Sequence, residues 1–204
     1  MLVDYYKARG ILDRYRIRSV NSEYVRSEDN AVSFLGKNGS IVLKVLSQKA
    51  LHKSKSGLVA VGLDSEDLVR KAFRSLQKKA ASLKPYNIIA QQMVAHGTEI
   101  IIGGSIDPQF GKMILLGLGG IYVETFKDFA LRLCPITRYD ASSMLAQLRS
   151  KGVIAPDKKS REMVVDLLLK TSRMFESTRI SELDLNPVIL HEGTYDAVDL
   201  RMLV

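Results

Sequence analysis

The sequence contains one cysteine, three histidines and no long uninterrupted apolar run. With Cys134 alone, the 204-residue chain can form no internal disulfide and no cysteine-rich metal site, which fits a reducing compartment. The N-terminal segment MLVDYYKARG has acid and aromatic residues where a signal peptide has its apolar core. No apolar stretch approaches the roughly 18 residues of a membrane span, so the sequence predicts a soluble cytoplasmic protein without a membrane partner.

The motifs of common nucleic-acid-binding modules are also absent, although the net charge is +8. Lysine and arginine are spread along the chain, and the sequence has neither an RNP-like aromatic motif nor C₂H₂ spacing. We therefore do not expect a nucleic-acid partner. A polyanionic small molecule or an acidic partner subunit suits the positive charge equally well. No Ser/His/Asp order or Cys/His pair indicates a catalytic triad.

The apolar patterns mix strands and helices without a strict βαβ alternation, which predicts an α+β fold of two lobes meeting near residues 88–96. We expect one lobe over residues 1–88 and the other over 89–204. Helices are predicted at 4–15, from Glu66 onward, at 140–148 and at 158–175. Strands are predicted at 40–47, 58–63, 88–94, 99–103 and 112–118, and in a C-terminal hairpin.

The C-terminal hairpin allows the sharpest inference. In ELDLNPVIL–HEGT–YDAVDLR the turn lies at Glu192-Gly193, and a loop of two or four residues gives the same register. Asn186 then faces Asp199, and Asp184 faces Arg201. Because side chains alternate along a strand, Glu182 shares this polar face. The other face, toward the core, takes Leu183, Leu185, Val198 and Leu200.

A carboxylate and an amide oxygen at this separation suit a hard cation. Mg²⁺ commonly takes one or two protein oxygens and completes its shell with water and nucleotide phosphates. The pair Asn186 and Asp199 is therefore a candidate magnesium site. The alternative is an ordinary amphipathic hairpin with a solvated polar face.

Other polar residues also interrupt apolar surroundings. Lys44 lies inside the strand IVLKVL, on the face of Val42 and Leu46, where it either reaches solvent or meets an anion in a cleft. Glu99 is a candidate for nucleotide binding or the polar end of a strand. The run Gly117-Leu118-Gly119-Gly120 departs from the dinucleotide-binding pattern and predicts a tight turn.

The three histidines differ in their settings. His96 and His191 lie in turn-like contexts and are expected to be solvated. His52 lies in the basic loop ALHKSKSGLVA, between two apolar runs. A neutral imidazole there could accept a phosphoryl group, with lysine, serine hydroxyls and backbone amides stabilising its charge. A solvated loop histidine is the simpler alternative.

Three segments together resemble one family: VLKVLSQKALHKSKSG, AQQMVAHGTEIIIGGSIDPQFGKMILLGLGGIYVETFKDFALRLCPIT and ELDLNPVIL…YDAVDLR. They look like the ATP-grasp β subunit of the NDP-forming acyl-CoA synthetases, the ADP-forming acetate–CoA ligases, which are related to the succinyl-CoA synthetase β subunit. The resemblance implies an ATP-grasp fold with ATP or ADP bound between two lobes. It also implies the reversible conversion of acyl-CoA, ADP and phosphate to acid, ATP and CoA. A CoA-binding α subunit would complete the enzyme, in an α₂β₂ assembly.

The resemblance also implies roles for single residues. Lys44 resembles the lysine that contacts nucleotide phosphates, and Asp184 the acid that orients a phosphohistidine. Asn186 and Asp199 match the family's Mg²⁺ ligands. His52 matches a histidine that carries phosphate between the CoA site and the nucleotide site. An interlobe hinge whose backbone meets adenine corresponds to Gln91, Gln92, Met93 and Val94.

The histidine loop departs from the family pattern at two positions. Lys55 replaces an acid, and Leu58 replaces a second glycine; the hinge also has Gln92 where glutamate is usual. Lys55 either strengthens phosphate binding or removes a group that orients His52, and Leu58 should stiffen the loop. A catalytically weakened nucleotide-binding regulatory or assembly subunit of the same complex is therefore the alternative function.

Overall fold

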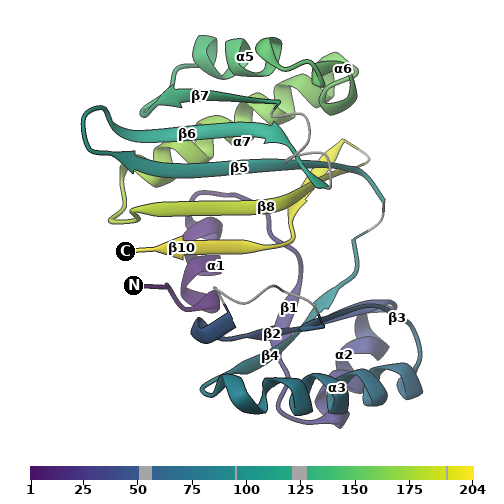
Figure 1. The fold of residues 1–204 in the computed structure, drawn as a ribbon. Helices are drawn as coiled ribbons and strands as arrows, with labels where there is room; N and C mark the ends of the chain where they lie inside the picture. Colours follow the sequence, from purple (N-terminus) through teal and green to yellow (C-terminus); the bar gives the residue numbers. More distant parts are fainter. Residues whose placement is uncertain (51–56, 95, 121–127, 192) are drawn as a thin grey trace. The chain divides into compact units, whose positions relative to one another are not determined.

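The computed structural model describes residues 1–50, 57–94, 96–120, 128–191 and 193–204 (Figure 1). The chain forms two compact units, one of Val20–Val94 and one of Met1–Ser19 with Ala95–Val204. Each unit contains an antiparallel sheet and helices, which confirms the predicted α+β class. None of the described helices combines the length and the apolar character that crossing a membrane would require.

These units differ from the expected division at residues 88 and 89. The strand that crosses this boundary, β4 (Asn87–Gln92), lies within the sheet of the smaller unit. Helix α1 (Tyr5–Arg14) belongs to the larger unit, where it contacts strand β10 (Leu200–Leu203). The sequence pattern could not reveal the placement of α1, because α1 and β10 lie at opposite ends of the chain.

The smaller unit is a four-stranded sheet with helices packed on one face. The strand order is β1-β4-β2-β3. Its other elements are β1 (Ser22–Tyr24), α2 (Glu28–Asn38), β2 (Ile41–Leu46), β3 (Val59–Leu63), α3 (Glu66–Ala80) and the 3₁₀ turns η1 (Gln48–Ala50) and η2 (Ala81–Leu83). Alternation along β2 directs Ile41, Leu43 and Val45 into one core with Phe34 of α2 and Phe73 of α3.

The larger unit is built on a six-stranded sheet. Five strands follow the order β10-β8-β5-β6-β7, and β9 extends the pairing along β8. Besides α1 and β10, its elements are β5 (Thr98–Asp107), β6 (Gly111–Leu118), β7 (Phe129–Leu133), α5 (Arg138–Gln147), α6 (Lys151–Ile154), α7 (Lys158–Glu176), β8 (Glu182–His191) and β9 (Thr194–Ala197).

Helices α7 and α1 lie behind this sheet in Figure 1, where α7 packs against β6 and α1 packs against β10. A Cβ added to Gly104 of β5 would lie 3.1 Å from Phe175 Cε1 of α7, so the helix approaches the strand closely there. The Lys112 ammonium fixes the end of α7 by donating to the carbonyl oxygens of Phe175 and Thr178, both at 2.6 Å. The sheet face opposite α7 is therefore the one that can present polar groups.

Candidate functional site

The predicted register of the C-terminal strands is confirmed. Asp184 of β8 pairs with Arg201 of β10, and Ile189 pairs with Asp196 further along the same strand. Asn186 lies opposite Asp199, because the Asn186 N–H donates to the Asp199 carbonyl oxygen at 3.2 Å. The expected core residues Leu183, Leu185 and Leu200 are buried, whereas Val198 is only half-buried. One face of these strands therefore carries Glu182, Asp184, Asn186, Asp199 and Arg201.

Asn186 of β8 supplies an amide oxygen, and Asp199, which directly precedes β10, supplies a carboxylate. Both residues are half-buried. Across the described ranges no three His, Cys, Asp or Glu side chains are grouped so that they could hold a metal by themselves. A two-residue oxygen set fits Mg²⁺ that arrives with nucleotide phosphates, because this ion keeps several non-protein ligands.

Asp184 belongs to a row of directly paired residues that crosses the whole sheet. It pairs with Arg201 on β10 and with Gly103 on β5; Gly103 pairs with Leu115 on β6, which pairs with Leu131 on β7. Paired residues on neighbouring strands point to the same face. The face is therefore charged at β8 and β10, has no side chain at Gly103, and is apolar at β6 and β7.

Lys44 and Gln91 come together on the sheet of the smaller unit. Lys44 pairs with Ile89 and Val42 pairs with Gln91, so all four side chains share the face opposite the helices. Lys44 is 9% exposed and Gln91 is 1% exposed. This burial argues against a Lys44 side chain extended into bulk solvent, and contact of Lys44 with an anionic ligand stays a prediction.

The segment of Gln91–Val94 uses part of its backbone inside the smaller unit. The Gln92 N–H donates to the Asn21 carbonyl oxygen at 2.9 Å, and the Met93 N–H donates to the Ser40 carbonyl oxygen at 3.0 Å. Both side chains are exposed. Since these two N–H groups are occupied, any backbone donor to a ligand in this segment must be another one, such as that of Val94.

Glu99 lies against the predicted glycine turn. The Gly119 N–H donates to the Glu99 carbonyl oxygen at 2.7 Å, and a Cβ on Gly119 would meet the Glu99 carbonyl carbon at 2.8 Å. Gly120 has φ +73°, and its missing Cβ would lie 3.0 Å from Glu99 Oε2. Gly117 and Leu118 lie in strand β6, so the predicted tight turn does not include them; Gly119 and Gly120 follow the strand, and 121–127 lie outside the described residues. Glu99 has a packing role against these two glycines whether or not it contacts a ligand.

His52 and Lys55 lie outside the described residues, as do the other members of 51–56. The described part of this loop begins at Gly57, which has φ +87°. The Lys79 ammonium of α3 would lie 2.6 Å from a Cβ at Gly57, so a cation covers the end of the loop. The functional assignment of His52 remains a prediction.

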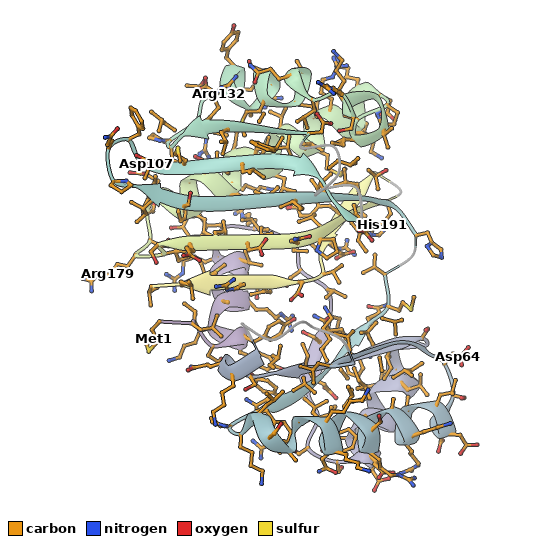
Figure 2. The ribbon with its side chains drawn as sticks, in the orientation of Figure 1. Met1, Asp64, Asp107, Arg132, Arg179 and His191 are labelled. Atoms are coloured by element: carbon orange, nitrogen blue, oxygen red, sulfur yellow. The ribbon has the colours of Figure 1, made fainter. Side chains whose placement is uncertain are left out.

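The expectation that His191 is solvated is wrong, whereas His96 is exposed as predicted. The His191 side chain, labelled in Figure 2, is 15% exposed, and its Nε2 lies 2.9 Å from Asp196 Oδ2. Asp196 also accepts a hydrogen bond from Arg18 Nε at 2.7 Å. Sequence reasoning missed this cluster, because Arg18 is 178 positions from its partner and no local pattern marks it.

Comparison with known proteins shows the family of this chain. The ATP-grasp domain family model matches residues 2–204. The acetate–CoA ligase [ADP-forming] I subunit beta of Pyrococcus furiosus is 34% identical over 208 residues, which covers 97% of this chain and 90% of that subunit. Some relatives are longer single chains, and against the two acetate–CoA ligases of Archaeoglobus fulgidus the chain spans 30% of their length.

Solved structures of similar proteins have the same fold as this chain. An acetyl-coenzyme A synthetase 1 of Ca. Korarchaeum cryptofilum, with coenzyme A, Ca-AMPCP and HgCl+, superposes with a TM-score of 0.89 at 33% identity, covering 100% of this chain and 93% of that one. The same enzyme with coenzyme A and Mg-AMPPCP gives 0.82 at 32% identity, covering 100% and 92%. In that second structure the phosphohistidine segment points towards the nucleotide-binding site.

Proposed function

Because the chain belongs to the ATP-grasp β subunits of the ADP-forming acyl-CoA synthetases, we propose that it transfers a phosphoryl group between a histidine relay and Mg²⁺-bound ADP. The observation that carries the proposal is the pairing of Asn186 with Asp199 on the same face as Asp184. This face offers metal ligands and a carboxylate that could receive a histidine ring.

Asn186 and Asp199 would hold the metal through their side-chain oxygens. A Mg²⁺ ion held by these two residues would supply positive charge that offsets the negative charge of nucleotide phosphates. The relative with bound Mg-AMPPCP supports this choice of ion and nucleotide. Among the described residues no group of three His, Cys, Asp or Glu side chains could hold a metal by itself, which suits an ion that shares its shell with phosphates.

Asp184 would orient the ring of the phosphorylated histidine. When phosphohistidine meets ADP, the ring N–P bond breaks and an oxygen of the ADP β-phosphate forms the new P–O bond. The other ring nitrogen keeps its proton, so the histidine leaves as neutral imidazole. A carboxylate that accepts a hydrogen bond from this N–H fixes the ring and stabilises its positive charge before transfer. His52, or the phosphohistidine of an α subunit, would be the donor.

Lys44 would contact nucleotide phosphates, and the segment Gln91–Val94 would contact adenine. The position of Lys44 on the same sheet face as Gln91, opposite the helices of the smaller unit, supports the first role. For the adenine contact, the Gln92 and Met93 N–H groups are already used, so another backbone group of the segment, such as the Val94 N–H, would make it. Glu99 is also a candidate nucleotide contact, but its packing against Gly119 and Gly120 gives it a structural role as well.

The assembly proposed here is cytoplasmic and pairs this chain with a CoA-binding α subunit, in an α₂β₂ arrangement. The relative from Pyrococcus furiosus is named as a β subunit, which supports a separate partner chain. Acyl-CoA, phosphate and ADP would be the substrates. The α subunit would hold the CoA site, and His52 would carry phosphate between the two sites.

The experiment is reconstitution. The chain is mixed with its α subunit, acetyl-CoA, ADP, phosphate and Mg²⁺, and ATP is measured. We expect ATP formation, and we expect His52→Ala to abolish it while Mg-ADP still binds. His96→Ala, at an exposed histidine, serves as the matched control. Full activity of His52→Ala would remove the relay from the proposal.

A second function has a specific motivation in the sequence. Lys55 and Leu58 replace the acid and the glycine of the family loop, which favours a nucleotide-binding subunit with weakened catalysis. Such a subunit would bind Mg-ADP and the α subunit, yet would form no acid-labile phosphohistidine. Restoring the family residues with Lys55→Asp and Leu58→Gly would then raise the rate of phosphohistidine formation.

A further inference from the structure

Among the described residues in the rows that cross the larger sheet at the candidate site, Arg201 carries the one positive charge. One row contains Arg201, Asp184, Gly103, Leu115 and Leu131. The next contains Leu203, Glu182, Ser105, Met113 and Leu133. Together with Asp199, this face has three carboxylates and a single guanidinium among the described residues of these rows.

The charge balance of this face is unfavourable for a phosphate ligand. Phosphoryl groups are anionic, and the carboxylates of Glu182, Asp184 and Asp199 would repel them. A magnesium ion at Asn186 and Asp199 offsets this repulsion at one end only. On the other side of Asp184, the nearest paired cation is Arg201, directly across the strand pair.

The existing contacts of Arg201 leave much of its donor capacity available. Its Nη2 lies 3.7 Å from Glu182 Oε2, longer than a hydrogen bond, and both side chains are substantially exposed, at 42% and 59%. Such an exposed pair contributes little to stability. The buried Arg201 Nε has no hydrogen-bond partner among the described residues. A buried donor without a partner is rare in a structural role and is often completed by a ligand.

We propose that Arg201 contacts the transferred phosphoryl group, an inference that rests on the proposed function. A guanidinium presents a planar fork of N–H donors that matches two phosphate oxygens, and it stays charged at every working pH. Arg201 would bind the phosphoryl oxygens beside Asp184, while the magnesium site binds those beside Asp199. It makes and breaks no covalent bond; it stabilises negative charge on the group in transit.

This role distinguishes ATP from ADP. The transferred phosphoryl is present in ATP and in phosphohistidine but absent from ADP. Arg201 should therefore matter for the γ-phosphate and hardly at all for the α- and β-phosphates. A merely structural arginine would affect both nucleotides alike, through the fold of the face.

The experiment measures Mg²⁺-dependent binding of ADP and of the non-hydrolysable ATP analogue AMPPNP by calorimetry, with the full chain. For Arg201→Gln we expect AMPPNP affinity to fall about 10- to 100-fold and ADP affinity to change less than about 3-fold. Arg201→Lys keeps the charge but loses the fork, and should show an intermediate loss. Arg179→Gln is the matched control, because Arg179 is exposed and projects away from the sheet in Figure 2.

Glu182→Gln tests whether the ion pair of Arg201 with Glu182, instead of a phosphate contact, explains the effect of Arg201→Gln. It removes the partner of Arg201 but leaves the guanidinium, so AMPPNP affinity should stay equal or rise. An equal loss for both nucleotides, no loss in Arg201→Gln, or the same loss in Glu182→Gln would overturn the inference. If Arg201→Gln fails to fold, Arg201→Lys and Glu182→Gln decide the matter. A wild-type chain that binds neither nucleotide with Mg²⁺ would overturn the proposed function itself.

Discussion

Asn186 and Asp199 face each other across the last antiparallel strand pair, and the N–H of the first donates to the carbonyl oxygen of the second at 3.2 Å. Asn186 lies within β8 and Asp199 directly precedes β10, so this backbone hydrogen bond holds the two residues opposite each other. The arrangement makes the pair a two-oxygen ligand set. Its predicted function as a magnesium site leads to the first test.

Replacing Asp199 by asparagine should weaken nucleotide binding in Mg²⁺ but not in its absence. The carboxylate supplies the negative charge for the ion, whereas an amide oxygen is a weaker ligand. We expect Mg-ADP affinity to fall about 10-fold or more, which calorimetry with and without Mg²⁺ would measure. Asp64→Asn is the control, since Asp64 is exposed on the other unit. Equal affinity of Asp199→Asn and the wild type in Mg²⁺ would remove Asp199 from the metal site.

Lys44→Met tests the phosphate contact. Methionine has a similar length and fills the same buried volume, so the smaller unit should stay folded. Loss of the ammonium should lower ADP affinity by about 10-fold or more, with little effect on adenosine. Lys37→Met, at an exposed position of α2, should leave both unchanged. A loss shared equally by adenosine would point to a packing role for Lys44 instead.

Gly104→Ala should destabilise the larger unit. The added methyl group would lie 3.1 Å from Phe175 Cε1 and 3.3 Å from Leu183 Cβ, which forces α7 or β8 to move. Overpacking of this kind costs about 1–3 kcal/mol. Gly10→Ala, inside α1 with no atom within 4 Å, should instead stabilise by up to about 1 kcal/mol. Thermal unfolding of both variants measures the contrast, and equal melting temperatures would contradict it.

Asp128→Asn should lower stability at neutral pH and lose its effect in acid. Burial pushes the pKa of the Asp128 carboxyl upward, but hydrogen bonds from Ser150 Oγ, Arg149 N–H and Ser150 N–H outweigh it and lower the pKa below the usual 3.8. A carboxyl with a lowered pKa stabilises the fold above its ordinary pKa, and this contribution disappears as pH falls through the lowered value.

At pH 7 the asparagine places an NH₂ group against one of these donors, which should reduce Tm by about 2–4 °C. The gap to the wild type should close as the pH falls below about 4. Thermal melts across pH 3–7 test this, with Asp64→Asn as a reference of equal charge change. A gap that stays constant in acid would mean that the ionised carboxylate has no part in the effect.

The C-terminal strands could be predicted from the sequence because their information is local. A turn at Glu192-Gly193 and two alternating runs suffice to set the register, and this register brings Asn186 opposite Asp199 and Asp184 opposite Arg201. The same holds for Lys44, whose apolar neighbours Leu43 and Val45 mark its strand and its face. Where the apolar pattern has the two-residue period of a strand, a short segment is enough to predict which face each side chain occupies.

Contacts between distant segments were decided only by the tertiary structure. Arg18 meets Asp196 from 178 positions away, so that His191 is half-enclosed beside a carboxylate instead of being solvated. Residues 1–19 pack with the C-terminal sheet, so they belong to the larger unit and not to the N-terminal lobe that was expected from their position in the sequence. Local pattern determines which face of a strand each side chain occupies; which strands become neighbours depends on packing free energy summed over the whole chain, and no single segment encodes it.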